Sequence, residues 1–176
     1  MVSLVTYVKG DIFKSPAQVL TNPVNCVGVM GKGLAFAFKN QFPGLFKDYK
    51  TRCDNNQVLP GQPYLWESET HQILNFPTKR HWRDKSVLQD IDEGLKFLAE
   101  NYEQMGIQSL ALPALGCGLG GLQWSEVQPL VEQYLGSIPD LDVYVYAPEK
   151  SLPEDKGSRS DKDNSAGAED TFAAHP

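Results

Sequence analysis

Short apolar runs alternate with amphipathic segments along residues 3–147. Runs rich in β-branched and aromatic residues predict strands, and apolar residues that recur every three or four positions predict helices. An alternation of strands and helices is typical of an α/β sandwich with a largely parallel or mixed sheet. The predicted strands are 3–8, 19–21, 64–67, 72–76, 110–112 and 142–147, with a turn at 9–12 that is followed by a second short extended piece. The predicted helices are 34–39, 44–52, 87–102 (with Ser86 as N-cap) and 125–136.

Two glycine-rich segments, 28–33 and 116–121, each lie between a predicted strand and a predicted helix. Glycine lets backbone N–H groups approach an anion closely, and such groups at the start of a helix bind phosphate. We therefore predict a ligand that carries phosphate groups. The alternative is a pair of tight loops without a ligand. The loops 22–33, 77–83 and 115–122 all follow predicted strands, so we expect them to converge on one cleft.

Familiar nucleotide-binding patterns do not describe these segments. Residues 116–121 match G-x-G-x-x-G, but they lie in the last βαβ unit, whereas a dinucleotide fingerprint belongs to the first. The Walker pattern fails because Lys32 is followed by Gly33 instead of serine or threonine. A different kind of phosphate ligand is therefore expected.

Composition narrows the class of protein. A chain of 176 residues predicts one domain, and its net charge of −6 argues against coating nucleic acid by charge alone. Three scattered cysteines and three scattered histidines predict neither a disulfide framework nor a metal site, and we expect no cofactor. No signal-peptide pattern and no apolar run of about 18 residues is present, so we expect a cytoplasmic protein without a membrane span.

The last part of the chain has a different composition. Residues 151–176 hold six acidic and three basic residues, and Leu152 and Phe172 are the only large apolar ones. Such a segment buries too little apolar surface to fold. We therefore predict a folded domain over 1–149 and a disordered polar tail over 150–176.

Four separated motifs resemble the macrodomain family of ADP-ribose binders: 10–12, 22–25, 31–35 and 113–121. The resemblance implies a three-layer α/β/α fold with a central mixed, mostly parallel sheet. It also implies that Asp11 binds the adenine amino group, that Asn22 and Asn25 lie by the distal ribose, and that both glycine loops clamp the diphosphate. Local turn bonding is the alternative for these polar residues. The implied ligand contacts are Asp11, Ile12, Asn22, Asn25, Gly31, Lys32, Gly33, Leu34, Ala35, Thr78, Gly116, Cys117, Gly118, Leu119, Gly120 and Gly121.

The segment 76–83, FPTKRHWR, resembles one branch of that family, the DarG antitoxins that remove ADP-ribose from thymidine in DNA. The resemblance implies that Lys79 is the catalytic residue, attacking C1″ of the distal ribose as a neutral amine or assisting cleavage there. Arg80 and Arg83 are expected to lower its pKa. Glutamate-specific glycohydrolases carry a catalytic aspartate where this chain has Gly120, so a lysine–aspartate pair is not expected. Cys117 is interpreted as a small loop residue, with a nucleophilic role as the weaker alternative.

The same segment is basic and aromatic within an acidic chain. Bases stack on aromatic side chains while cations meet phosphates, so Arg80, His81, Trp82 and Arg83 are predicted to contact nucleic acid. The alternative is a solvated loop with Trp82 packed back on the core.

Together with the resemblance, these features predict a metal-independent ADP-ribosyl hydrolase. It is expected to remove ADP-ribose from a modified macromolecule, with DNA as the expected carrier. Within the enzyme class, the alternatives are deacetylation of O-acetyl-ADP-ribose and removal of phosphate from ADP-ribose 1″-phosphate. A non-catalytic ADP-ribose reader is the alternative from another class. By the same resemblance, a DarT-like ADP-ribosyltransferase toxin is the expected partner, and the protein is expected to be a monomer.

Overall fold

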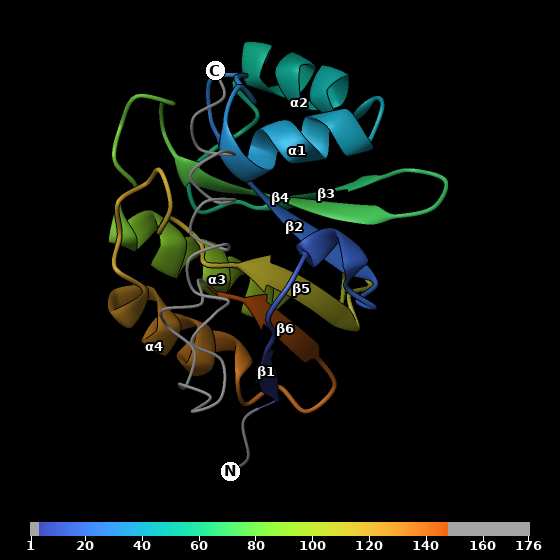
Figure 1. Ribbon diagram of the computed structural model, residues 1–176, viewed down its shortest axis with the longest axis vertical. Coiled ribbons are helices and arrows are strands. Elements are labelled where there is room, and N and C mark those ends of the chain that lie inside the picture. The colour runs from blue at the N-terminus through green and yellow to red at the C-terminus, as the bar shows by residue number, and fades with distance from the viewer. Residues whose placement is uncertain (1–3, 148–176) are drawn as a thin grey trace, which may run out of the picture.

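A six-stranded sheet forms the centre of the molecule, with helices packed on both faces (Figure 1). The structure is a computed structural model that describes residues 4–147. The strands are β1 Val5–Tyr7, β2 Val19–Asn25, β3 Tyr64–Glu67, β4 Gln72–Lys79, β5 Ser109–Pro113 and β6 Asp142–Tyr146. The helices are α1 Gly33–Gln41, α2 Leu45–Asp54, α3 Leu88–Asn101 and α4 Trp124–Leu135, with a 3₁₀ turn, η1, at Ile12–Lys14.

The order of strands in the sheet is β1-β6-β5-β2-β4-β3. All neighbours are parallel except β3, which pairs antiparallel with β4 at one edge. The sheet is therefore mixed and mostly parallel, as the sequence predicts. Parallel strands need covered faces, and the apolar runs of β2, β4 and β5 satisfy this because both of their faces are buried.

Two apolar clusters fill the space on the two sides of the sheet. One holds Ile91 and Leu95 of α3 together with Val127 and Val131 of α4. The other cluster lies under η1, α1 and α2. Its buried members include Ile12, Phe38, Phe42, Leu45, Tyr49 and Cys53. Strand residues divide between the clusters by alternation, since Leu110 and Leu112 join the first and Ala111 joins the second. The three-layer arrangement is thus confirmed.

At the centre of the sheet, the connections that follow neighbouring strands lead to helices on opposite faces. The chain passes from β2 to α1 on one face, whereas it passes from β4 to α3 and from β5 to α4 on the other. Because β2 and β5 are neighbours, their carboxyl ends form a topological switch point, where α/β sheets open a crevice. This position is where the two glycine loops begin.

Two predicted loops prove to be strand. β2 continues through residues 22–25, and β4 continues through Pro77 to Lys79, because the two strands stay paired along this length. Beyond Leu20, β2 is paired only with β4. That unpaired side accommodates Pro23, which has no N–H to donate.

Other predicted elements need smaller corrections. The turn predicted at 9–12 leads into a 3₁₀ turn and not into an extended piece, because Asp11 Oδ1 accepts the Phe13 N–H at 2.9 Å. Ser86 does not cap α3, whose N-cap is Val87 and lacks a side-chain hydrogen bond. The tail predicted over 150–176 lies outside the described residues. Within 4–147, no helix is long and apolar enough to cross a membrane.

Gly94 of α3 provides a test of how β4 packs on the helical layer. A Cβ at this position is placed 2.4 Å from Cζ of the buried Phe76 ring. We expect Gly94→Ala to lower the free energy of unfolding by about 1–3 kcal/mol from overpacking, although alanine is the better helix former by about 1 kcal/mol. Urea unfolding measures this.

The matched control is Gly118→Ala, because a Cβ there meets nothing within 4 Å. Its unfolding free energy should stay within about 0.5 kcal/mol of wild type. Equal stability of Gly94→Ala and wild type would contradict the contact between Phe76 and α3.

Candidate functional site

Three loops that follow parallel strands meet at the carboxyl edge of the sheet. They are 26–32 after β2, 80–87 after β4 and 114–123 after β5. The Leu119 side chain lies 3.6 Å from the place where a Cβ on Gly33 is built, so the two glycine loops are in contact range. The Ser86 N–H donates to the Gly120 carbonyl at 2.9 Å and connects the loop 80–87 with the loop 114–123. The predicted convergence of the loops is therefore confirmed.

The loop 114–123 exposes unpaired donors. Its turns are closed by the Leu122 N–H on the Gly116 carbonyl (3.0 Å) and the Gly121 N–H on the Gly118 carbonyl (3.2 Å). Positive φ values of 75° and 79° at Gly116 and Gly121 permit these turns. The N–H groups of residues 118–120 donate to no described residue. Such a row of free amide donors suits an anion.

Gly120 is fixed by sterics. A Cβ on this residue is placed 2.1 Å from Ser86 Oγ and 2.4 Å from the Gly116 carbonyl oxygen. The second contact is with the backbone, which cannot move aside. A side chain at position 120 therefore does not fit this loop conformation, which excludes an aspartate here as it stands.

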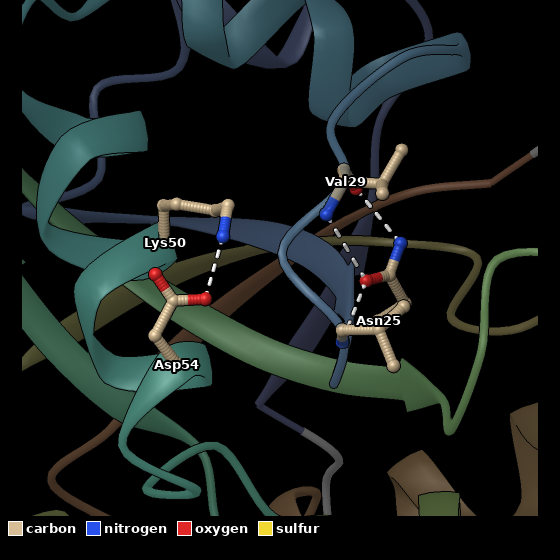
Figure 2. A network of polar contacts seen from close by, with 5 residues as sticks. Asn25, Val29, Lys50 and Asp54 are labelled. Atoms are coloured by element: carbon tan, nitrogen blue, oxygen red, sulfur yellow. Dashed lines mark hydrogen bonds and ion pairs between the residues drawn. The ribbon is translucent and has the colours of Figure 1, made fainter.

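Asn25 shapes the loop 26–32. Its Oδ1 accepts the N–H groups of Val27 (3.0 Å) and Val29 (3.4 Å), and its Nδ2 donates to the Val29 carbonyl at 2.7 Å (Figure 2). The Tyr49 hydroxyl, buried on α2, donates to Asn25 Oδ1 at 2.7 Å. Local bonding thus occupies this side chain, and its contact with a ribose stays a prediction.

The same loop passes close to α2. A Cβ on Gly28 is placed 2.8 Å from Cδ of Lys50, whose ammonium pairs with Asp54 one turn later at 2.5 Å (Figure 2). Gly28 has φ +83°, so the backbone conformation favours glycine, whereas the flexible Lys50 side chain can shift to admit a Cβ. After this turn the chain enters α1, and the N–H groups of its first turn, at residues 33–35, donate to no described residue. A helix N-terminus of this kind is a second donor set for an anion.

Two predicted contacts lie below the surface. Asn22 has no exposed surface, and its Nδ2 donates to Asn75 Oδ1 on β4 at 3.0 Å. Asn75 in turn donates to the Tyr64 hydroxyl at 3.2 Å. Thr78 is 6% exposed and lies 3.5 Å from the Val24 carbonyl. This geometry places both side chains within the sheet and gives no support to direct ligand contacts from them.

The end of β1 lies at the same edge. Asp11 is exposed and follows β1, and the Ile12 N–H donates to no described residue, so both remain available to a ligand there. Tyr146, the last residue of β6, pairs with Pro113 at the end of β5. It is half-buried and was not singled out from the sequence, where it is one aromatic in an alternating strand.

Lys79 is the last residue of β4, and its Nζ donates to the Trp82 carbonyl at 3.2 Å. Its pKa is lowered, first by burial and then by the ammonium groups of Lys85 and Lys32, while Asp84 acts in the opposite direction. Burial, one of the causes expected for a lysine of this kind, is the largest, but lysines supply the cationic neighbours in place of the expected Arg80 and Arg83. A lower pKa makes the neutral, nucleophilic amine more available near neutral pH.

Lys85 is the functional candidate that the sequence did not reveal. Its Nζ lies 3.1 Å from the place of a Cβ on Gly121, so its side chain runs along the second glycine loop. Nothing in the local pattern distinguishes it from other exposed lysines. It lies in the loop that follows Lys79, six residues further on, and the Ser86 N–H bond to the Gly120 carbonyl holds this part of the loop beside the second glycine loop.

The basic and aromatic segment divides into two parts. Arg80 keeps a side chain that is 61% exposed, but its Nε and Nη2 donate to the two carboxylate oxygens of the buried Asp90 on α3, both at 3.1 Å. Trp82 turns outward at 41% exposure, with the His81 ring stacked at 5.4 Å and Arg83 Cζ 4.5 Å from its ring centre. Trp82 does not pack back on the core, so that alternative is wrong.

An apolar rim surrounds the three loops. Of the six large hydrophobic side chains that are exposed within 4–147, five belong to these loops. Apolar groups on the rim and donors within it suit a ligand with both a flat base and phosphates. The rim consists of Val27, Val29, Trp82, Val87 and Leu119.

Cysteine and metal chemistry have little structural support here. Burial raises the pKa of the Cys117 thiol to about 11, and its Sγ lies 3.5 Å from the Leu115 carbonyl. It therefore remains a protonated thiol near neutral pH. Within residues 4–147, no three histidine, cysteine or acidic side chains are grouped so as to hold a metal ion.

Taken together, the fold and this edge define an α/β sandwich whose two glycine loops present free amide donors suited to a phosphate-bearing ligand. The family model of the Macro domain matches residues 21–131, and the chain belongs to that family. A DNA ADP-ribosyl transferase–DNA ADP-ribosyl glycohydrolase fusion protein of Thermosipho africanus is 44% identical over 84% of this chain and 43% of its own length.

Solved structures of related proteins have the same fold. The macrodomain of Mycobacterium tuberculosis DarG is similar with a TM-score of 0.79 and 39% identity, covering 82% of this chain and 97% of that one. Thermosipho africanus DarTG in complex with ADP-ribose has a TM-score of 0.80 and 42% identity, covering 88% of this chain and 45% of that one. The chain spans less than half of the length of the first two curated relatives it matches, 43% and 41%.

Tyr49 provides a test of how the first glycine loop is held. Tyr49→Phe removes the hydroxyl that donates to Asn25, so the buried Asn25 oxygens lose a partner. We expect the free energy of unfolding to fall by about 1–3 kcal/mol. Chemical denaturation measures this, and Tyr144→Phe is the control because the Tyr144 hydroxyl bonds to no described residue. Equal losses in both variants would contradict a specific link between Tyr49 and Asn25.

Proposed function

We propose that this chain is an ADP-ribosyl hydrolase that binds ADP-ribose in the cleft and removes it from modified DNA. The observation that carries the proposal is the half-buried Lys79 at the end of β4, whose pKa is lowered by burial and by Lys85 and Lys32, at the edge of the sheet where two loops with free amide donors also lie. The name of the Thermosipho africanus relative, which includes DNA ADP-ribosyl glycohydrolase, supports this reaction. The complex of DarTG with ADP-ribose supports the ligand.

The proposed binding mode uses the whole carboxyl edge. Asp11 accepts a hydrogen bond from the adenine amino group, and a carboxylate suits an exocyclic amine. The free N–H groups of 118–120 and of the start of α1 take the diphosphate. Binding energy from these remote parts then holds the distal ribose with C1″ against Lys79.

Lys79 then acts on C1″ as a neutral amine. Its lone pair forms a bond to C1″, or supports the positive charge that develops there, as the glycosidic electron pair leaves with the base. The departing base takes up a proton, and water completes the release of ADP-ribose. Gly120 leaves no room for an aspartate beside this centre, so the chemistry rests on the lysine.

A nucleic-acid carrier accounts for the outer part of the loop 80–87. Trp82 is exposed, with Arg83 over its ring and His81 stacked on it, and a base takes a place in this stack while Lys85 lies at the glycine loop. In this proposal the folded unit is 1–149, it acts as a monomer in the cytoplasm, and a DarT-like transferase provides the modification that it reverses. The fusion of transferase and glycohydrolase in the named relative supports that partner.

Lys79→Ala tests the catalytic assignment. On a single-stranded oligonucleotide carrying ADP-ribosyl-thymidine, we expect release of ADP-ribose to fall by about 10²–10⁴-fold. Affinity for free ADP-ribose, measured by calorimetry, should change little because the amine adds little to binding of the ADP part. Lys47→Ala on the exposed side of α2 is the control and should retain full activity.

The other outcomes separate the competing functions. Normal hydrolysis by Lys79→Ala removes Lys79 from the mechanism. Release of acetate from O-acetyl-ADP-ribose, or of phosphate from ADP-ribose 1″-phosphate, without action on the oligonucleotide assigns the chain to those reactions. Tight binding of ADP-ribose by wild type with no turnover of any substrate identifies a reader.

The pH dependence of the reaction tests the cationic neighbours. Activity should rise with pH as the Lys79 amine loses its proton, since only the neutral form acts. Lys85→Gln removes a like charge that lowers the pKa of Lys79, so the rise should move to higher pH, leaving Asp84 and Lys32 as the remaining charged neighbours. Rates near neutral pH should therefore fall, and rates at high pH should converge with wild type.

Lys85→Arg is the matched variant because it keeps the charge. Its pH profile should coincide with that of the wild type. An unchanged profile in Lys85→Gln would show that Lys85 does not influence the catalytic amine.

A further inference from the structure

Arg80 and Asp90 form an ion pair that the binding site does not require. Asp90 is 3% exposed and lies in the first turn of α3. Both of its oxygens accept from Arg80, and no other side-chain partner is present among residues 4–147. A buried carboxylate with a single cationic partner depends on that partner. The pair is therefore a fixed contact between the end of β4 and α3.

The backbone on the other side of Lys79 is irregular. Val24 pairs with Pro77 and the next residue, Asn25, pairs with Lys79, so β4 has one extra residue, Thr78, at this point. A bulge of this kind changes the direction in which the following side chain points. It also leaves the strand end with fewer ladder hydrogen bonds to hold it.

Lys79 thus lies between a bulge and an anchored residue. Thr78 precedes it, and Arg80 follows it with a two-point attachment to α3. A planar guanidinium that makes two parallel hydrogen bonds fixes orientation as well as distance, which a single ammonium contact does not. The attachment of Arg80 therefore limits how the backbone at Lys79 can turn.

We propose that Arg80 is a positioning residue, and that its fork on the buried Asp90 holds the end of β4 so that the Lys79 amine faces the cleft. The inference rests on the proposed function for its kinetic consequence and on geometry alone for its structural one. It also revises the prediction that Arg80 contacts nucleic acid, because two of its donors are already directed to the protein interior.

Substitution of Asp90 distinguishes a positioning role of Arg80 from a role in contacting DNA. At 3% exposure it cannot touch a polynucleotide, whereas Arg80 is partly exposed and can. Asp90→Asn keeps the shape of the side chain but removes the charge that holds the fork. An effect on catalysis from Asp90→Asn is therefore an effect through Arg80 and the strand end.

The first measurement is kinetic, on the ADP-ribosylated oligonucleotide with the whole chain. We expect Arg80→Gln and Asp90→Asn to lower kcat by about 10- to 100-fold, the loss that follows a small displacement of a catalytic group. KM and the affinity for unmodified oligonucleotide should change little. The double variant should be no worse than either single one, because both remove the same contact.

Arg80→Lys covers the case in which the other variants fold poorly. It keeps a cation on Asp90 without the two-point attachment, and its kcat should fall between wild type and Arg80→Gln. The matched control is Asp48→Asn, which breaks the Arg52–Asp48 pair on α2 at 2.9 Å, away from the cleft. It should retain the wild-type kcat.

The second measurement does not depend on activity. Titration of the Lys79 amine, followed by NMR of methyl-labelled lysines, reports how that amine is placed among Lys85, Lys32 and Asp84. In Arg80→Gln and Asp90→Asn its pKa should move upward toward the ordinary value as the side chain becomes more exposed. In Asp48→Asn it should stay as in wild type.

The results distinguish the two proposals. If wild type hydrolyses no substrate but the titration moves as expected, the proposed function fails and the positioning of Lys79 stands. If Asp90→Asn leaves both kcat and the titration unchanged, positioning is overturned. If Arg80→Gln only weakens affinity for the oligonucleotide, Arg80 is a DNA contact.

Discussion

The parallel pairing of β2 with β4 is the interaction on which the rest of the site depends. It runs from Val19 opposite Gln72 to Asn25 opposite Lys79. Asn25 shapes the first glycine loop, and Lys79 is the candidate nucleophile, so one ladder sets both at the same height of the carboxyl edge. Because β2 and β5 send their helices to opposite faces, that same edge opens into a crevice.

Steric and electrostatic constraints then determine which chemical groups this edge of the sheet presents. Gly120 has backbone and Ser86 atoms where a side chain begins, which leaves a lysine without an acidic partner on that loop. Lys32 and Lys85 add like charge beside Lys79, which disfavours its protonated form. The apolar rim and the exposed Trp82 surround these groups, and an acidic protein thereby presents a local surface suited to a base and its phosphates.

The errors in the sequence-based elements have a common physical cause. Asn22, Pro23 and Pro77 are typical of loops, and they were assigned to loops. They lie in strands because the backbones of β2 and β4 pair along this length, and because β2 has no paired neighbour on its other side beyond Leu20. Asn22 could then be buried against Asn75, a partner 53 residues away. No local pattern contains that pairing.

Local pattern was sufficient for the class of fold and the two glycine loops, whereas the candidate lysine came from the resemblance of residues 76–83 to one branch of the macrodomain family. Apolar periodicity specifies which segments are buried, and glycine at strand–helix junctions has a direct conformational meaning. What surrounds Lys79 was decided by tertiary structure. Lys32 was brought near it from the loop after β2, and Arg80 was directed to Asp90 by the packing of the end of β4 on α3. Electrostatic effects depend on distance in space, and sequence separation does not give that distance.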